Sequence, residues 1–111
     1  MVIVDNHVYF TNWNTQDVKI LNLETYFIEG SININGLPES IVSNGSYLWV
    51  AISSGSTVEK ISLETHEIVE SIEVGNGPQQ MLLVGDLLWI SRTYYSADWS
   101  ETYYGTSQIN V

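Results

Sequence analysis

Tyr47-Leu48-Trp49-Val50-Ala51-Ile52 is an apolar run that follows the turn-forming segment Asn44-Gly45-Ser46. The pattern returns at Leu87-Leu88-Trp89-Ile90, so Trp89 follows Trp49 by 40 residues. Another 40 residues before Trp49 lies Tyr9, within the apolar segment Val8-Tyr9-Phe10. The chain therefore contains three copies of one unit, each with an aromatic residue at the same place.

The repeat extends well beyond the aromatic residue. The pairs of similar residues that lie 40 apart are Val18 and Val58, Leu21 and Ile61, Leu23-Glu24-Thr25 and Leu63-Glu64-Thr65, Ile28 and Ile68, Ile32 and Ile72, Ile34 and Val74, and Pro38 and Pro78. The first two copies align without a gap, whereas the third keeps the register only to about Arg92. An internal period of this length, carried by short β-rich segments, is typical of the blades of a β-propeller.

Within each unit, short apolar stretches are separated by Gly, Asn and Asp, which tolerate the positive φ angles of tight hairpin turns. We expect four antiparallel strands per unit, the first innermost and the last, which carries charges, at the outer edge. No stretch shows a sustained helical period. The sequence predicts an all-β chain of three blades: blade 1 at about residues 1–38, blade 2 at about 39–78 and an incomplete blade 3 at about 79–111.

Blade 3 departs from the repeat after Arg92, where an aromatic insertion occupies residues 93–104. The final Gln108-Ile109-Asn110-Val111 resembles Lys60-Ile61-Ser62-Leu63, which makes the last strand the third of its blade and leaves the fourth missing. An alternative alignment makes it the fourth strand, with the third lost in the insertion. The approach Gly105-Thr106-Ser107 favours the first alignment.

The composition describes a folded, acidic chain. Hydrophobic residues make up 44% and aromatic residues 12% of the 111 residues, which is ample for a packed core. Thirteen acidic and three basic residues give a formal charge of -10. Such a surface repels phosphate groups and anionic lipids, so we expect neither a nucleic-acid partner nor a membrane partner.

The sequence lacks several common functional motifs and targeting signals. With no cysteine, disulfides and thiolate metal sites are excluded. No phosphate-binding glycine loop, nucleophile elbow or metal-ligand spacing is present, so the sequence predicts no cofactor and no metal. The start of the chain, Met1-Val2-Ile3-Val4-Asp5, resembles neither a signal peptide nor a membrane span, and the localisation stays unknown.

Three segments of blade 2 carry a family resemblance: Leu48-Trp49-Val50-Ala51, Val58-Glu59-Lys60-Ile61-Ser62-Leu63-Glu64-Thr65, and the stretch from Ile68 to Pro78. They resemble the YVTN-type repeat of the NHL/YncE-like β-propellers, and the resemblance covers nearly the whole chain outside the aromatic insertion. It implies the fold and says little about activity, because such propellers include surface and periplasmic proteins, binding modules, lyases and lactonases.

Propellers of the kind that this repeat resembles usually close with six or seven blades, whereas this chain carries three. An open arc would expose apolar blade faces and a sheet edge, so we expect self-association. Two chains would complete a six-bladed ring about a two-fold axis, which makes a homodimer the favoured assembly. Three chains would give a wider nine-bladed ring, and the remaining alternative is that the sequence is part of a longer propeller.

The aromatic insertion is the first candidate for function. Tyr and Trp rings beside carboxylates and amides can stack on sugar faces or anchor a protein partner. The candidate ligand-binding residues are Tyr94, Tyr95, Trp99, Tyr103 and Tyr104, together with Trp13 from a polar loop. The alternative is that these rings cover an interface between blades or chains.

The entrance to the central channel is the second candidate. The polar residues at the start of the inner strands are Glu39, Ser40, Gln79 and Gln80. They are expected near the axis, where they could hold a small ligand, a cation or only water.

The sequence gives little indication of a catalytic acid or base. His7 occupies a strand position that other units fill with Tyr47 and Leu87, and His66 lies in an outer turn, so the two are not expected to meet. The sequence therefore predicts no catalytic residue. Tyr9, Trp49 and Trp89 are expected in the core.

Two hypotheses follow. In the first, the chain is a non-enzymatic binding or structural module that self-assembles and recognises a carbohydrate or a protein through its aromatic loop. In the second, it is a propeller lyase or hydrolase with a metal or small-molecule site in the central channel. The scarcity of histidine and the lack of converging acid-base residues favour the first.

Overall fold

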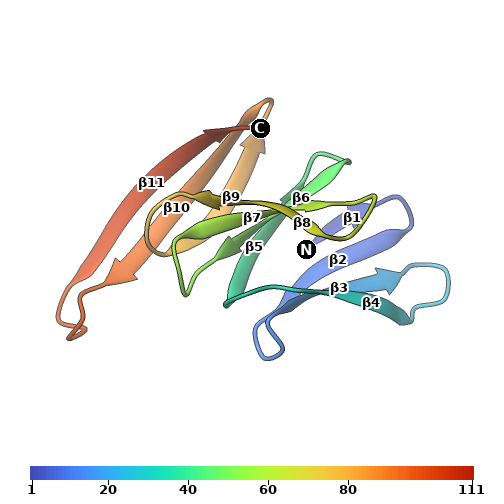
Figure 1. Cartoon of the computed structure of the whole chain (residues 1–111), viewed down its shortest axis with the longest axis horizontal. Helices are drawn as coiled ribbons and strands as arrows, with labels where there is room; N and C mark the ends of the chain where they lie inside the picture. The colour runs from blue at the N-terminus through green and yellow to red at the C-terminus, as the bar shows by residue number, and fades with distance from the viewer.

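A computed structural model describes all 111 residues, and it contains eleven strands and no helix. The three sheets contain β1 (Val2–Val4), β2 (His7–Asn12), β3 (Asp17–Asn22) and β4 (Ile28–Asn33); β5 (Pro38–Ser43), β6 (Tyr47–Ile52), β7 (Thr57–Ser62) and β8 (Ile68–Glu73); and β9 (Pro78–Val84), β10 (Leu87–Tyr95) and β11 (Thr102–Asn110). Figure 1 shows the sheets following one another in chain order across the molecule. The predicted all-β chain of antiparallel propeller blades is confirmed.

The 40-residue repeat is visible in the strand pairing. Val2 lies opposite Tyr9 in blade 1, Val42 opposite Trp49 in blade 2, and Leu82 opposite Trp89 in blade 3. The turns before these aromatic strands contain Asp5, Gly45 and Gly85, each with a positive φ. Residues that accept this conformation therefore place each hairpin in the same register.

The hydrophobic core lies between the blades. One cluster packs Tyr9, Val18 and Ile20 of blade 1 against Leu48 and Val50 of blade 2. A second cluster packs residues of blade 2 against blade 3. The first strand of blade 2, β5, contacts both β1 and β9, so the first strands of the three blades lie side by side, as around a propeller axis.

The exposure of Trp89 shows that the prediction of a core position for all three aromatic residues of the repeat is wrong at this residue. Trp49 is 1% exposed because blade 3 covers it, whereas Trp89 is 41% exposed. The two residues share a repeat position and differ in whether another blade follows them.

Blade 3 has three strands in the order β9, β10 and β11, so the last strand is the third of its blade. The residues expected as an inserted loop instead continue the hairpin, with Thr93 opposite Tyr104 and Tyr95 opposite Thr102. Only Ser96 to Glu101 form the turn. With nine residues in each strand, the β10–β11 hairpin is longer than the β2–β3 and β6–β7 hairpins, whose strands have six residues each, and it lies at the left end of the molecule in Figure 1. The structure offers no apolar helix of the length needed to cross a bilayer.

Candidate functional site: an uncharged aromatic groove

A groove of about 660 Å³ runs along the ends of the blades where the second and third strands are joined. Its lining residues are Trp13, Leu37, Ser53, Ser54, Gly55, Asn76, Gly77, Gln79, Thr93, Tyr94, Tyr95, Ser96, Ala97 and Trp99. They come from all three blades, and no Asp, Glu, Lys, Arg or His is among them. In a chain with a formal charge of -10, this surface is uncharged.

The turn of the β10–β11 hairpin supports one wall of the groove. The Asp98 carboxylate accepts hydrogen bonds from the Ser100 hydroxyl at 2.7 Å, the Ser100 backbone N–H at 3.0 Å and the Ser96 hydroxyl at 2.8 Å. These hydrogen bonds, those from Ser100 first, lower the pKa of Asp98 to about 2. The same turn holds Trp99 at a φ of 63°, with its N–H donating to the Ser96 carbonyl at 2.9 Å.

The rings of the hairpin pair with one another. Tyr95 and Trp99 lie with ring centroids 5.0 Å apart, and Tyr94 stacks on Tyr103 at 5.2 Å with an interplanar angle of 22°. The Tyr103 hydroxyl donates to the Glu101 carboxylate, and this hydrogen bond raises the pKa of Tyr103. Tyr103 therefore supports Tyr94 from outside the groove and keeps the wall in place.

Gly77 joins the three segments that form the floor. Its N–H donates to the Gly55 carbonyl at 2.9 Å, and its carbonyl accepts from the Thr93 N–H at 2.8 Å. A β-carbon on Gly77 would lie 1.9 Å from the Thr93 carbonyl oxygen, and its φ is +68°. Only glycine fits this close approach of the two backbones.

Arg92 ties blade 3 to blade 2 beneath the groove. One guanidinium nitrogen donates to the Asn76 carbonyl at 3.3 Å, and the guanidinium carbon lies 5.5 Å from the centroid of the Tyr94 ring. A β-carbon on Gly75 or on Gly105 would come within 2.6 Å of the guanidinium nitrogens. The two glycines therefore leave the space that Arg92 fills.

The groove brings together several residues that the sequence singled out. Trp13, Tyr94, Tyr95 and Trp99 line it, and so does Gln79 from the channel group. The Trp13 indole N–H donates to the Glu39 carboxylate at 2.7 Å, which links the aromatic group to the inner strands. We expected two separate candidate surfaces, and the structure places parts of both at one site.

Other candidates lie outside the groove lining. Tyr104 is largely exposed on the hairpin, and Tyr103 lies behind Tyr94. The Ser40 hydroxyl accepts a hydrogen bond from the Met81 N–H at 3.3 Å and so links the inner strands of blades 2 and 3, whereas Gln80 is exposed. A ligand role for these residues stays a prediction.

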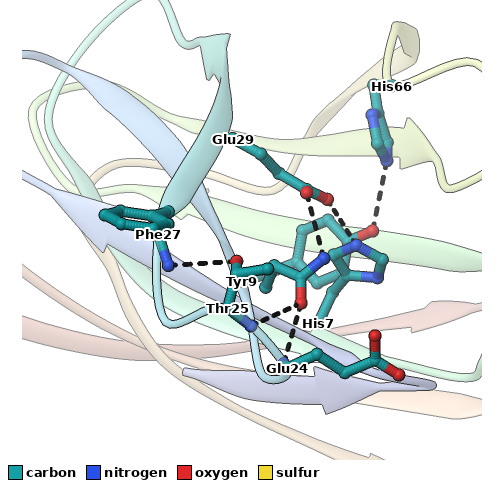
Figure 2. A network of polar contacts seen from close by, with 8 residues as sticks. His7, Tyr9, Glu24, Thr25, Phe27, Glu29 and His66 are labelled. Atoms are coloured by element: carbon teal, nitrogen blue, oxygen red, sulfur yellow. Dashed lines mark hydrogen bonds and ion pairs between the residues drawn. The ribbon is translucent and has the colours of Figure 1, made fainter.

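A polar network lies at the opposite ends of the strands, between blades 1 and 2 (Figure 2). We expected His7 and His66 not to meet. Their rings lie on the same residue, Tyr9, at centroid distances of 6.4 and 5.8 Å, without a hydrogen bond to each other. The Tyr9 hydroxyl is 3.1 Å from His66 Nε2, and His7 Nε2 contacts the Glu29 carboxylate. Sequence spacing did not reveal this network because its members belong to different blades.

Two shifted pKa values reflect the surroundings of this network. Burial, followed by the negative charges of Asp5 and Glu29, raises the pKa of Tyr9. A hydrogen bond from the Asn22 amide and the contact with His7 lower the pKa of Glu29. No three side chains of His, Asp or Glu converge closely enough to hold a metal ion. Through the contact between Tyr9 and His66, the network links blade 1 to the turn between β7 and β8 of blade 2.

Solved structures with a similar backbone identify the fold. The chain matches hydrazine synthase from Kuenenia stuttgartiensis with a TM-score of 0.72 at 14% identity, over 96% of this chain and 33% of that chain. It matches Hsv2 from Kluyveromyces lactis with a TM-score of 0.64 at 13% identity, over 83% of this chain and 28% of that chain. These proteins are β-propellers. The chain has the fold of a propeller segment.

A third neighbour, apo AztD from Citrobacter koseri, gives a TM-score of 0.61 at 14% identity, over 93% of this chain and 32% of that one. This segment thus spans about a third of the length of its structural neighbours. No protein-family model matches the chain, and no curated protein does. At these identities the likeness concerns the fold alone, and the neighbours include enzymes and binding proteins.

Proposed function

We propose that this propeller segment is a binding module whose aromatic groove takes a neutral carbohydrate. The observation that carries the proposal is the lining itself, which combines Tyr and Trp rings with hydroxyl and amide groups and contains no charged residue. Ring faces complement the apolar faces of a sugar, and hydroxyls and amides pair with its hydroxyl groups.

The electrostatics of the lining favour a neutral ligand over a charged one. A ligand charge buried in the groove would lose its hydration without gaining an ionised partner from the lining. The lining also contains neither a carboxylate nor an imidazole that could act as a general acid or base within the groove. Recognition therefore fits the groove better than hydrolysis or elimination.

The rigidity of the walls also supports binding. Two hydrogen bonds of Gly77, the Arg92 contact with Asn76 and the ring pairing of the hairpin hold the lining before a ligand arrives. A site that is already ordered costs less conformational entropy when it binds.

We further assign the repeat to the YVTN type. The support is the agreement of Leu48-Trp49-Val50-Ala51 and the segments that follow it with that pattern, together with the equivalent strand register at Tyr9, Trp49 and Trp89. This assignment concerns only the family of the repeat. The choice of ligand rests on the residues that line the groove.

The binding test uses cellotetraose, maltotetraose, mannotetraose and chitotetraose, titrated by calorimetry into the wild type and two variants. Trp99 is 75% exposed in the groove lining, and Tyr26 is 76% exposed in the turn between β3 and β4, outside the lining; both residues have a positive φ. We expect Trp99→Ala to weaken binding of the preferred sugar about 10- to 100-fold, and Tyr26→Ala to leave the affinity unchanged. If none of the four sugars binds at about 10 mM, or if the two variants behave alike, the proposal is wrong.

A further inference from the structure

Two blade faces remain uncovered at the ends of the arc. The blade 3 open face comprises Leu82, Val84, Leu87 and Trp89, which are cross-strand neighbours on β9 and β10. The blade 1 open face comprises the exposed Met1 and Ile3, the half-buried Phe10 and Leu21, and Val8, which is 7% exposed. Large apolar side chains are exposed on both, among them Leu82, Val84 and Trp89 on one face and Met1 and Ile3 on the other.

The junctions inside the chain show what covers such a face. Where blades 1 and 2 meet, Tyr9 is in the same buried cluster as Leu48 and Val50. Where blades 2 and 3 meet, the buried cluster contains Trp49 with Leu88 and Ile90. Each aromatic residue thus lies in one buried cluster with the pair of apolar residues that flank the next aromatic residue along the repeat.

The same rule defines the surface that Trp89 requires. The residues that correspond to Leu48 and Val50, and to Leu88 and Ile90, are Val8 and Phe10 of blade 1. They flank Tyr9 on the blade 1 open face. Trp89 and that face belong to opposite ends of the same arc, so a second molecule can bring them together.

We propose that the blade 3 open face binds the blade 1 open face of a second copy of this chain, with Trp89 seated on Val8 and Phe10. Two copies then form two equivalent junctions about a two-fold axis and close a ring of six blades. The 41% exposure of Trp89 would fall toward the 1% of Trp49, since both would lie in the same kind of junction.

Charge does not oppose this junction despite the net charge of -10. The strands of the blade 3 open face also present Gln80, Ser91, Thr106 and Gln108 to solvent, all of them uncharged. On β3, Lys19 is neutralised by Asp17, whose carboxylate oxygen lies 2.8 Å from the Lys19 nitrogen. The residue at the same repeat position in blade 2, Glu59, is buried and accepts hydrogen bonds from Thr57 and Ser71. This position therefore tolerates burial when its polar group is paired.

The test is the solution mass over a dilution series, measured by sedimentation and light scattering for the wild type and three variants. Val84 and Val69 are both 54% exposed strand valines, but Val69 lies on the outer strand β8 of blade 2, away from both open faces. We expect a dimer for the wild type and for Val69→Glu. We expect Val84→Glu on one open face and Ile3→Glu on the other to raise the dissociation constant more than about 100-fold.

The variants also distinguish the way in which the faces pair. If blade 3 faces paired with each other, Ile3→Glu would remain a dimer while Val84→Glu would not, and this would overturn the proposal. A wild-type monomer or trimer would overturn it as well. Circular dichroism checks folding, and Leu82→Lys repeats the blade 3 test with the opposite charge should Val84→Glu fail to fold.

Discussion

Gly77→Ala is the most informative single change because it tests the backbone contact on which the groove depends. Alanine at this position would place its β-carbon 1.9 Å from the Thr93 carbonyl oxygen and 3.1 Å from the Tyr94 β-carbon. Non-bonded carbon contacts are most favourable at about 3.5 to 4.0 Å, so β10 must move away from the link between β8 and β9.

The expected loss of stability is the sum of three effects. Alanine in a left-handed conformation costs about 1 kcal/mol, because the φ of Gly77 is +68°. The hydrogen bonds that Gly77 makes with Thr93 and Gly55 each contribute about 1 kcal/mol. We therefore expect the free energy of unfolding to fall by about 3 kcal/mol, a large part of the 5 to 15 kcal/mol that is typical of a folded domain.

Gly85→Ala is the matched control. Its φ of +58° is similar, and a β-carbon there would meet nothing within 4 Å, so only the conformational cost of about 1 kcal/mol remains. The assay is urea unfolding of both variants and the wild type at one protein concentration, which keeps any contribution of association equal. Equal losses for the two variants would refute the claim that Gly77 is required by the close backbone contact.

Two further predictions concern ionised groups. Asp17 is 4% exposed, and although burial acts to raise its pKa, hydrogen bonds from Lys19 and Thr15 and the charge of Lys19 outweigh burial and lower it. Its stabilising effect is thus present above the ordinary pKa of 3.8 and lost as the pH falls through the lowered value. Lys19→Met should raise the pKa of Asp17 above 3.8, because burial then outweighs the remaining hydrogen bond. Measured by urea unfolding, the variant should lose about 3 kcal/mol of stability at pH 7 and less at pH 3. An equal loss at both pH values would contradict this prediction. For Asp98, carbon NMR titration should give a pKa of about 2, and Ser100→Ala should raise it, whereas a wild-type value of 3.8 would show that the turn hydrogen bonds do not form in solution.

The repeat could be predicted from the sequence because each blade uses the same local chemistry. Residues such as Gly45 and Gly85 mark the turns, and the apolar runs around Trp49 and Trp89 mark the strands between them. Identical local patterns then produce identical registers. The exposure of Trp89 could not be predicted from this local pattern. It depends on whether another blade covers the blade 3 open face, and not on the residue itself.

The aromatic hairpin was only partly predictable. Thr93-Tyr94-Tyr95 and Thr102-Tyr103-Tyr104 are segments of high β-propensity on either side of a polar turn, which is a hairpin signal. Departure from the repeat made an inserted loop the simpler interpretation. The joining of Trp13 and Gln79 to this hairpin in one groove needed the placement of the blades, since no sequence period relates them.

The most direct measurement for the binding groove is the indole N–H spectrum of the four tryptophans during titration with the preferred tetrasaccharide. Trp13 and Trp99 line the groove, whereas Trp49 is buried between blades and Trp89 lies on the blade 3 open face. We expect the Trp13 and Trp99 signals to shift together with one dissociation constant while the Trp49 and Trp89 signals stay in place. Shifts confined to Trp89, or no shift of Trp13 and Trp99 at saturating sugar, would contradict the assignment of the groove as the carbohydrate site.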